Sequence, residues 1–198
     1  MYQNIATKVL TGEVRTSYAH LDQPYAPPNS KDTPKYSVAL LLPKSDYATK
    51  ADIDASIEAA IQEAITKKWN GAKPPIIPLP VHDGDSTRQD GTQRGEECKG
   101  HWIISARSTN KPQIVHQSNI AVELLPQDIY SGQYARVTLN FFGYNFNGKK
   151  GIGCGLGNVM ITRDGEPLSG GASAEKDFAG VAATQPAINP LTGQPYMS

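Results

Sequence analysis

Aromatic, cationic and hydrogen-bonding side chains alternate with apolar ones along one segment, residues 134–146, which reads YARVTLNFFGYNF. Successive side chains of a β-strand point to opposite faces, so the alternation predicts a two-faced strand. The two faces would hold Ala135, Val137, Leu139 and Phe141 on one side, and Tyr134, Arg136, Thr138, Asn140, Phe142 and Tyr144 on the other. Aromatic rings beside a cation can stack nucleic-acid bases and hold phosphates. The alternative is an outer face that only covers a helix or a partner subunit.

The next segment, residues 148–159, reads GKKGIGCGLGNV and also alternates. Gly151, Gly153, Gly155 and Gly157 would share one face, which would leave that face bare. A bare strand face lets another chain or a ligand backbone approach closely. We interpret it as room for a packed helix, with approach of a DNA backbone as the alternative. A dinucleotide fingerprint is excluded, because the glycines are two apart and no amphipathic helix follows them.

The residues with the chemistry for nucleic-acid binding fall into two groups. The candidates for base stacking are Trp102, Tyr134, Phe142 and Tyr144; those for phosphate contacts are Arg107, Arg136, Lys149 and Lys150, with Lys99 and Arg88 from a long loop. Trp102 stands beside two isoleucines, so a place in the core is its alternative. Tyr18 and Tyr36 are predicted to pack in the barrel.

The elements that would position these residues are mostly strands. The 198 residues include 18 glycines and 15 prolines, and helical periodicity is confined to one segment, which favours a β-rich domain with long loops. Strands are expected over 5–21 with a break near Gly12, and over 36–42, 101–108, 113–115 and the two segments above, with Asn147-Gly148 as a hairpin turn. Residues 22–35 and 71–100 are expected to be loops, and 120–125 an apolar patch.

The one expected helix lies within Ser45 to Trp69 and is most regular over about 50–69. Ile53, Ile57, Ile61 and Ile65 recur every four residues and form an apolar stripe. Thr49 followed by Asp52 resembles a capping box, and Asn70-Gly71 would end the helix. We expect the stripe to pack on the sheet.

Catalytic and metal-binding patterns are weak in this chain. Cys98 and His101 have a ligand-like spacing, but a single pair is unspecific. Asp83-Gly84-Asp85 lacks the other carboxylates of a calcium loop and predicts a turn. No nucleophile motif or P-loop occurs, so no enzymatic activity, metal or cofactor is expected. An enzyme with its site in the 71–100 loop stays open as an alternative.

The charge distribution and the hydropathy of the chain bear on its binding partners and its cellular location. Nineteen basic residues balance nineteen acidic ones, but residues 101–163 hold six basic against two acidic side chains, whereas 164–198 hold one against four. The segregation allows a positive groove on the β-rich part. No apolar run could span a bilayer, no signal peptide is visible, and two cysteines make no disulfide framework. These features predict a cytoplasmic chain with no membrane contact.

Several sequence blocks, which follow one another in a distinctive order, resemble those of a known protein family. They are YSVALLLPK, the Ile-striped helix, HDGD, KGHWIISARS, YSGQYARVTLNFFGYN, GKKGIGCGLGNV and RDGEPLSG. Over about residues 5–178 the chain resembles a family of bacteriophage single-stranded DNA-binding proteins, formerly a domain of unknown function and distantly related to the replication binders of podophages. The resemblance implies an OB-fold, a five-stranded barrel with long loops and an inserted helix. We expect it over 1–168, with a flexible tail over 169–198.

The resemblance also implies a function. It is the coating of unwound DNA without sequence specificity during phage replication and recombination, in the host cell cytoplasm. Single-stranded DNA is the expected partner, and phage replication proteins and a second copy of the chain are further candidates. Such proteins commonly end in an acidic tail, whereas the last 20 residues here contain no acid. The alternative is a β-barrel structural phage protein that does not bind DNA.

Overall fold

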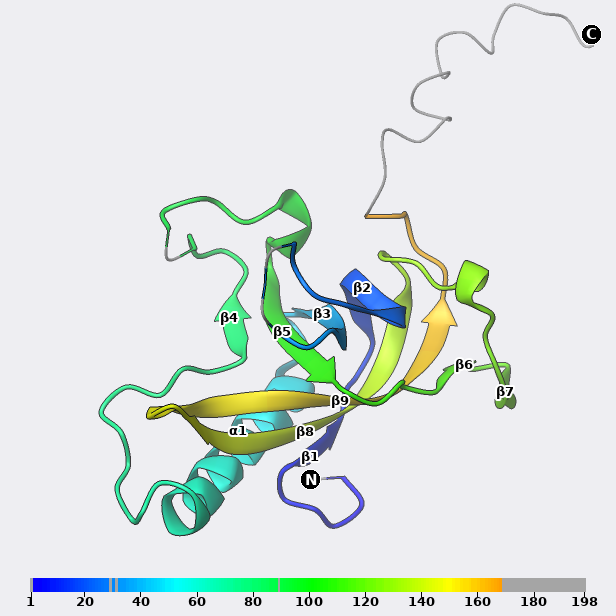
Figure 1. Ribbon diagram of the computed structural model, residues 1–198. Coiled ribbons are helices and arrows are strands. Elements are labelled where there is room, and N and C mark those ends of the chain that lie inside the picture. Colours follow the sequence, from blue (N-terminus) through cyan, green and yellow to red (C-terminus); the bar gives the residue numbers. More distant parts are fainter. Residues whose placement is uncertain (1, 29, 31, 89, 169–198) are drawn as a thin grey trace, which may run out of the picture.

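The computed structural model describes residues 2–28, 30, 32–88 and 90–168, and the predicted tail 169–198 lies outside these residues. The described chain is mostly β-structure with one α-helix (Figure 1). The elements are β1 (Lys8–Leu10), β2 (Val14–Tyr25), β3 (Lys35–Pro43), α1 (Tyr47–Lys67), β4 (Val81–Asp83), η1 (Glu96–Cys98), β5 (His101–Ser108), β6 (Ile114–His116), β7 (Asn119–Glu123), η2 (Pro126–Asp128), β8 (Tyr134–Phe146) and β9 (Lys149–Arg163).

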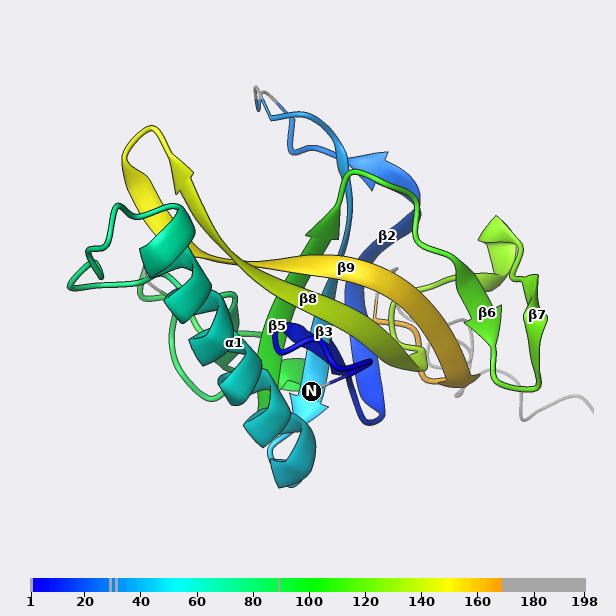
Figure 2. The same ribbon diagram turned by 90° about the horizontal axis from the view of Figure 1, so that it is seen from below.

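Five of the strands close into a ring in the order β2-β3-β5-β9-β8, and β8 pairs back onto β2. All pairs in the ring are antiparallel except β5 with β9, which run parallel. This order is that of an OB-fold barrel, so the predicted fold is confirmed. Four short strands, β1, β4, β6 and β7, extend the sheet beyond the predicted five. Figure 2 shows β6 and β7 projecting at one end of the molecule, opposite the β8–β9 turn.

The inside of the ring is filled by alternate side chains of its strands. In β8, Ala135, Val137, Leu139 and Phe141 are each at most 1% exposed, as the alternation predicts. Leu40 of β3 and Ile104 of β5 are fully buried in the same core. Asn147 and Gly148 both have positive φ and join β8 to β9, which confirms the predicted turn.

Helix α1 covers the part of β8 nearest the turn (Figure 1). Its isoleucine stripe and Ala60 and Ala64 are buried against the sheet, as predicted, although Ile65 is only partly buried. The helix begins earlier than 50 because the Asp46 carboxylate accepts a hydrogen bond from the Thr49 amide and caps it. The predicted Thr49–Asp52 capping box is therefore wrong. The helix ends at Lys67, and Asn70 and Gly71, with positive φ, follow it as expected.

The predicted packing of Tyr18 is wrong. Tyr18 is 65% exposed and has a φ of 45° at a register shift between β2 and β3, so it is the extra residue of a β-bulge. The bulge shifts the following residues by one position. Tyr36, by contrast, is half-buried against the core. Strand β2 continues to Tyr25, so the loop begins after residue 25, four residues later than the predicted start at residue 22.

The long segment 71–100 is not structureless. Strand β4 pairs with β5, and Asp83 and Asp85 both accept hydrogen bonds from the Lys44 ammonium at 2.6 Å. The Asp85 amide donates to the Asp83 carboxylate, which makes the predicted turn. In the part of the chain that the structure describes, no helix is long and apolar enough to cross a membrane.

Candidate nucleic-acid interface

The outer face of the ring carries one row of residues across four strands. His20 of β2 lies opposite Ser37 of β3, Ser37 opposite Arg107 of β5, and Arg107 opposite Gly155 of β9. Directly paired residues share a face of the sheet, so the side chains of His20, Ser37 and Arg107 point outward together, beside the bare backbone of Gly155. The second and third strands of the ring, here β3 and β5, form the face with which OB-folds bind oligonucleotides.

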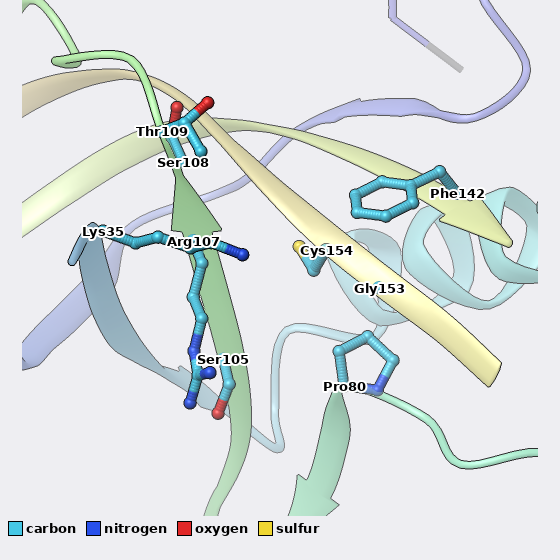
Figure 3. Close-up of a pocket in the computed structure, with 9 residues that line it drawn as sticks. All are labelled: Lys35, Pro80, Ser105, Arg107, Ser108, Thr109, Phe142, Gly153 and Cys154. Carbon is cyan, nitrogen blue, oxygen red and sulfur yellow. The ribbon is translucent and has the colours of Figure 1, made fainter. Parts of the chain in front are cut away.

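A groove of about 480 Å³ lies along this face, between β5 and β9. Figure 3 shows Lys35 and Arg107 on one side of it, the Phe142 ring and Gly153 on the other, and Pro80 below. Ser105, Ser108 and Thr109 supply hydroxyl groups from β5 and its end, and Cys154 completes the lining. The groove thus offers two cations, an aromatic ring and hydrogen-bonding groups to one ligand.

The glycines of β9 explain how Phe142 lies. A Cβ at Gly153 would lie 2.7 Å from the tip of the Phe142 ring, and one at Gly151 would collide with the Tyr144 hydroxyl. The far ends of these two rings therefore reach over the bare backbone of β9. Our interpretation of the glycine face as room for the helix is wrong, because α1 packs on the opposite side of β8, with Ala64 against Gly143. Phe142 remains 42% exposed and lines the groove, and the Lys68 ammonium lies 5.9 Å from its ring centroid.

Two aromatic residues that we did not predict extend this surface onto β2. His20 and Tyr25 stack with ring centroids 4.3 Å apart and an interplanar angle of 11°. Tyr25 lies opposite Lys35, at the start of the loop that joins β2 to β3. The sequence shows only an aromatic residue before, and a lysine after, a proline-rich loop; their contact depends on the β2–β3 register.

Trp102 does not join the groove. It lies on the core face of β5, partly buried, and the ammonium groups of Lys44 and Lys50 lie 5.0 Å and 4.5 Å from its ring centroid. Arg107, five residues later, points to the opposite face of the same strand. The alternative reading of Trp102, a core position, fits this placement.

Tyr134 and Arg136 share the outer face of β8 but lie away from the groove. The Tyr134 ring has Arg163 at 3.3 Å from its centroid and Arg15 at 5.8 Å. The Arg136 Nε donates to the Thr11 carbonyl. The Tyr134 ring therefore contacts two arginines, and Arg136 ties β8 to the turn before β2 while its side chain stays exposed.

The predicted lysines divide in the same way. Lys149 is exposed at the start of β9, on the same outer face as the groove residue Gly153, and Tyr144 of β8 shares that face. Lys150 points to the other face and donates to the Trp69 carbonyl at the end of the helix. Lys99 forms an exposed ion pair with Glu96 at 2.8 Å. Arg88 lies in a second pocket, described below.

The titratable groups give no sign of nucleophilic or metal chemistry. Burial raises the pKa of the Cys98 and Cys154 thiols, so both are protonated at neutral pH. Hydrogen bonds from Lys44 lower the pKa of the Asp83 and Asp85 carboxyl groups, which serve to hold the loop. Within the described ranges, no group of three His, Cys, Asp or Glu side chains could hold a metal ion.

A closed OB-fold ring with a cationic and aromatic groove between β5 and β9 places this chain in the class of OB-fold proteins that bind oligonucleotides. It belongs to the family described as Enterobacter phage Enc34, ssDNA-binding protein, whose model matches residues 7–188. The predicted family is therefore confirmed.

Solved structures agree with this assignment. The chain is similar to the single-stranded DNA-binding protein from bacteriophage Enc34 in complex with ssDNA, with 30% identity, a TM-score of 0.69, and coverage of 82% of this chain and 90% of that one. Protein p50 of Acyrthosiphon pisum secondary endosymbiont phage 1 is 28% identical over 176 residues, 84% of this chain and 89% of the relative. A single-stranded DNA-binding protein of bacteriophage T7, gp2.5, shares the fold at 16% identity and a TM-score of 0.56, over 92% of this chain and 98% of that one.

Proposed function

We propose that the chain binds single-stranded DNA without sequence specificity, in the groove between β5 and β9. The observation that carries the proposal is the convergence of Lys35, Arg107 and the accessible Phe142 ring on one 480 Å³ groove. The groove lies between the β2–β3 loop and the β8–β9 turn, where OB-folds take oligonucleotides. Membership of a family of phage single-stranded DNA-binding proteins supports the same ligand.

The chemistry divides between charge and stacking. Lys35, Arg107 and Lys149 neutralise phosphates, so binding releases counterions and weakens as salt rises, with a slope of roughly −0.7 per phosphate. Phe142 and, beside it, Tyr144 stack bases, and the His20–Tyr25 pair offers a second stacking surface across Lys35. Base stacking tolerates any sequence because every base has a π-face.

The biological setting follows from the relatives. We infer that the chain coats unwound DNA during phage replication and recombination in the host cytoplasm, and that it acts by binding rather than by catalysis. Phage replication proteins and a second copy of the chain are the further partners we propose. Residues 1–168 form the binding domain in this proposal, and 169–198 a separate tail.

Fluorescence anisotropy of a labelled oligo-dT of about 16 nucleotides tests the groove. The double variant Lys35→Gln/Arg107→Gln should reduce the salt slope by about 1.4, so that its affinity loss is about sevenfold larger at 50 mM than at 200 mM salt. Lys50→Gln/Lys67→Gln is the matched control, because it removes the same charge from lysines of α1 already paired with Asp54 and Glu63.

Each rival has its own outcome in this experiment. A wild-type chain that binds neither single- nor double-stranded DNA would be a structural phage protein. Release of nucleotides on incubation with a divalent metal would indicate an enzyme. Equal affinity for single- and double-stranded DNA of the same length would contradict the stacking of unpaired bases.

A further inference from the structure

A second pocket, of about 630 Å³, adjoins the groove. The two meet on strand β4, because Pro80 lines the groove and the next residue, Val81, lines the pocket. The Ser105 amide donates to the Pro80 carbonyl at 2.9 Å, so the groove residue next to Val81 is held against β5. A ligand that leaves the groove along β4 therefore reaches this pocket next.

Two arginines in the pocket form no ion pair within 4 Å among the described residues, although the charge of Arg88 also acts on the Asp90 carboxylate of the same pocket. They are Arg88 and Arg94, in contrast to Lys44, Lys50, Lys67, Lys99 and Arg163, which do form ion pairs. The Nε of Arg94 is enclosed and lacks a hydrogen-bond partner within the described ranges. An enclosed donor without an acceptor costs about 1–3 kcal/mol, so this group calls for an acceptor.

The two acidic residues of the pocket are already satisfied. Asp83 is held by Lys44 at 2.6 Å, and Asp90 accepts hydrogen bonds from the amide and the hydroxyl of Thr92. His82 also lines the pocket, beside the two arginines. It adds no positive charge, because burial and the charge of Arg94 lower the pKa of its imidazole. Ser86 and Thr87 place hydroxyl groups beside the arginines. Two unpaired guanidinium groups flanked by hydroxyls suit a phosphate, which guanidinium recognises with paired hydrogen bonds.

We propose that Arg88 and Arg94 form a second phosphate-binding subsite, which takes a backbone phosphodiester of the DNA strand where it leaves the groove along β4. The inference rests on the proposed function, because it extends the same strand beyond the groove. It makes the 81–94 segment part of the binding surface and predicts that the subsite is used only by oligonucleotides long enough to reach it.

The test compares two oligonucleotide lengths on the full chain. OB-folds occupy about 4–16 nucleotides, so dT of about 4 nucleotides probes the groove alone and dT of about 16 probes groove and pocket together. Arg88→Gln/Arg94→Gln should weaken binding of the long oligonucleotide and reduce its salt slope by about 1.4, but leave binding of the short one unchanged. Lys50→Gln/Lys67→Gln, with the same loss of charge, should alter neither. A 5′-phosphorylated short oligonucleotide and inorganic phosphate as a competitor identify the source of the phosphate.

The outcomes separate this inference from the proposed function. Unchanged affinity and salt slope for the long oligonucleotide would overturn the subsite and leave the groove intact, whereas a wild-type chain that binds neither length would overturn both. Loss at both lengths, or an equal loss in the lysine control, would also overturn the subsite. Tight binding only of the 5′-phosphorylated short strand, or competition by inorganic phosphate at the same concentration as DNA, would replace the phosphodiester with a terminal or free phosphate. Since Arg94 is partly buried, Arg88→Gln alone, at an exposed position, decides the case with a slope change of about 0.7 if the double variant does not fold.

Discussion

Removal of the Phe142 ring isolates base stacking from charge. The far end of the ring lies over the backbone of Gly153 and the ring lines the groove, so Phe142→Ala deletes a stacking surface and no charged group. The ring lies on the outer face of β8, so its loss opens no hole among the buried residues inside the barrel.

The size of the effect follows from this position. Base–aromatic stacking contributes about 1–3 kcal/mol per base, and about 1.4 kcal/mol corresponds to a tenfold change in Kd. Phe142→Ala should therefore weaken binding about 5- to 150-fold, with an unchanged salt slope. The ring contributes to folding only as a cross-strand neighbour, which is worth about 0.2–1 kcal/mol, so the variant should stay folded.

The assay is a titration of labelled oligo-dT at several salt concentrations, with thermal unfolding measured on the same samples. Tyr47→Ala is the control, because Tyr47 is an aromatic residue of α1, is 79% exposed, and lies outside the groove. Equal affinity for Phe142→Ala and the wild type would refute stacking on this ring. A loss that is the same in both variants would refute the assignment of stacking to the groove.

Three further predictions test the parts that position the site. Gly153→Ala should fold but displace the end of the Phe142 ring. Anisotropy should show weaker DNA binding than in the wild type, with a smaller loss than in Phe142→Ala. Unchanged affinity would show that DNA binding does not depend on the position of this ring. Because hydrogen bonds from Lys44 lower the pKa of Asp85, its contact with the Gly100 amide should be complete above the ordinary carboxyl pKa of about 3.9 and be lost as pH falls through the lowered value. An NMR titration of that amide should show a midpoint that rises in Lys44→Met, and an unmoved midpoint would contradict the role of Lys44. Truncation after Leu168 should leave Tm unchanged, whereas truncation after Gly165 should lower Tm by about 2–4 °C. The reason is that Leu168 packs on Leu41 and Ile103, and its amide donates a hydrogen bond to the Ser131 carbonyl. Equal Tm values of the two truncated proteins in calorimetry would contradict this domain boundary.

Much of the fold could be predicted because its signals are local. The alternation in 134–146, the Asn147-Gly148 turn and the isoleucine stripe each act over a few residues, and each appears in the structure as predicted. Tyr18 could not be placed in this way, because a single bulge residue shifts the register and nothing in its neighbours marks the shift. The N-cap of the helix, Asp46, was not predicted because several acidic and hydroxyl residues near that point could act as caps.

The site was less predictable, because it depends on which strands become neighbours. Arg107 and Phe142 were predicted from their residue types, and the structure brings them to one groove. Lys35 and Pro80 join them only through the pairing of β3 with β5 and of β4 with β5, which no local pattern specifies. Trp102 shows the converse, since an aromatic residue on a correctly predicted strand belongs to the core when its register points it inward.

The alternation in β9 links the closure of the barrel to the shape of the groove. Ile152, Cys154 and Leu156 fill the core, so the residues between them must face outward, where any side chain would stand between the rings of β8 and the strand. With glycine at those places the far end of the Phe142 ring reaches over β9, and the ring lines the groove that Arg107 and Lys35 line from the opposite side. A base stacked on that ring would then have its phosphate within the reach of those cations, because stacking fixes the plane of the base and the strand continues beside it. The glycines therefore matter to binding through the orientation they impose on the rings, and substitution at Gly153 should change affinity even though glycine itself offers no group to the DNA.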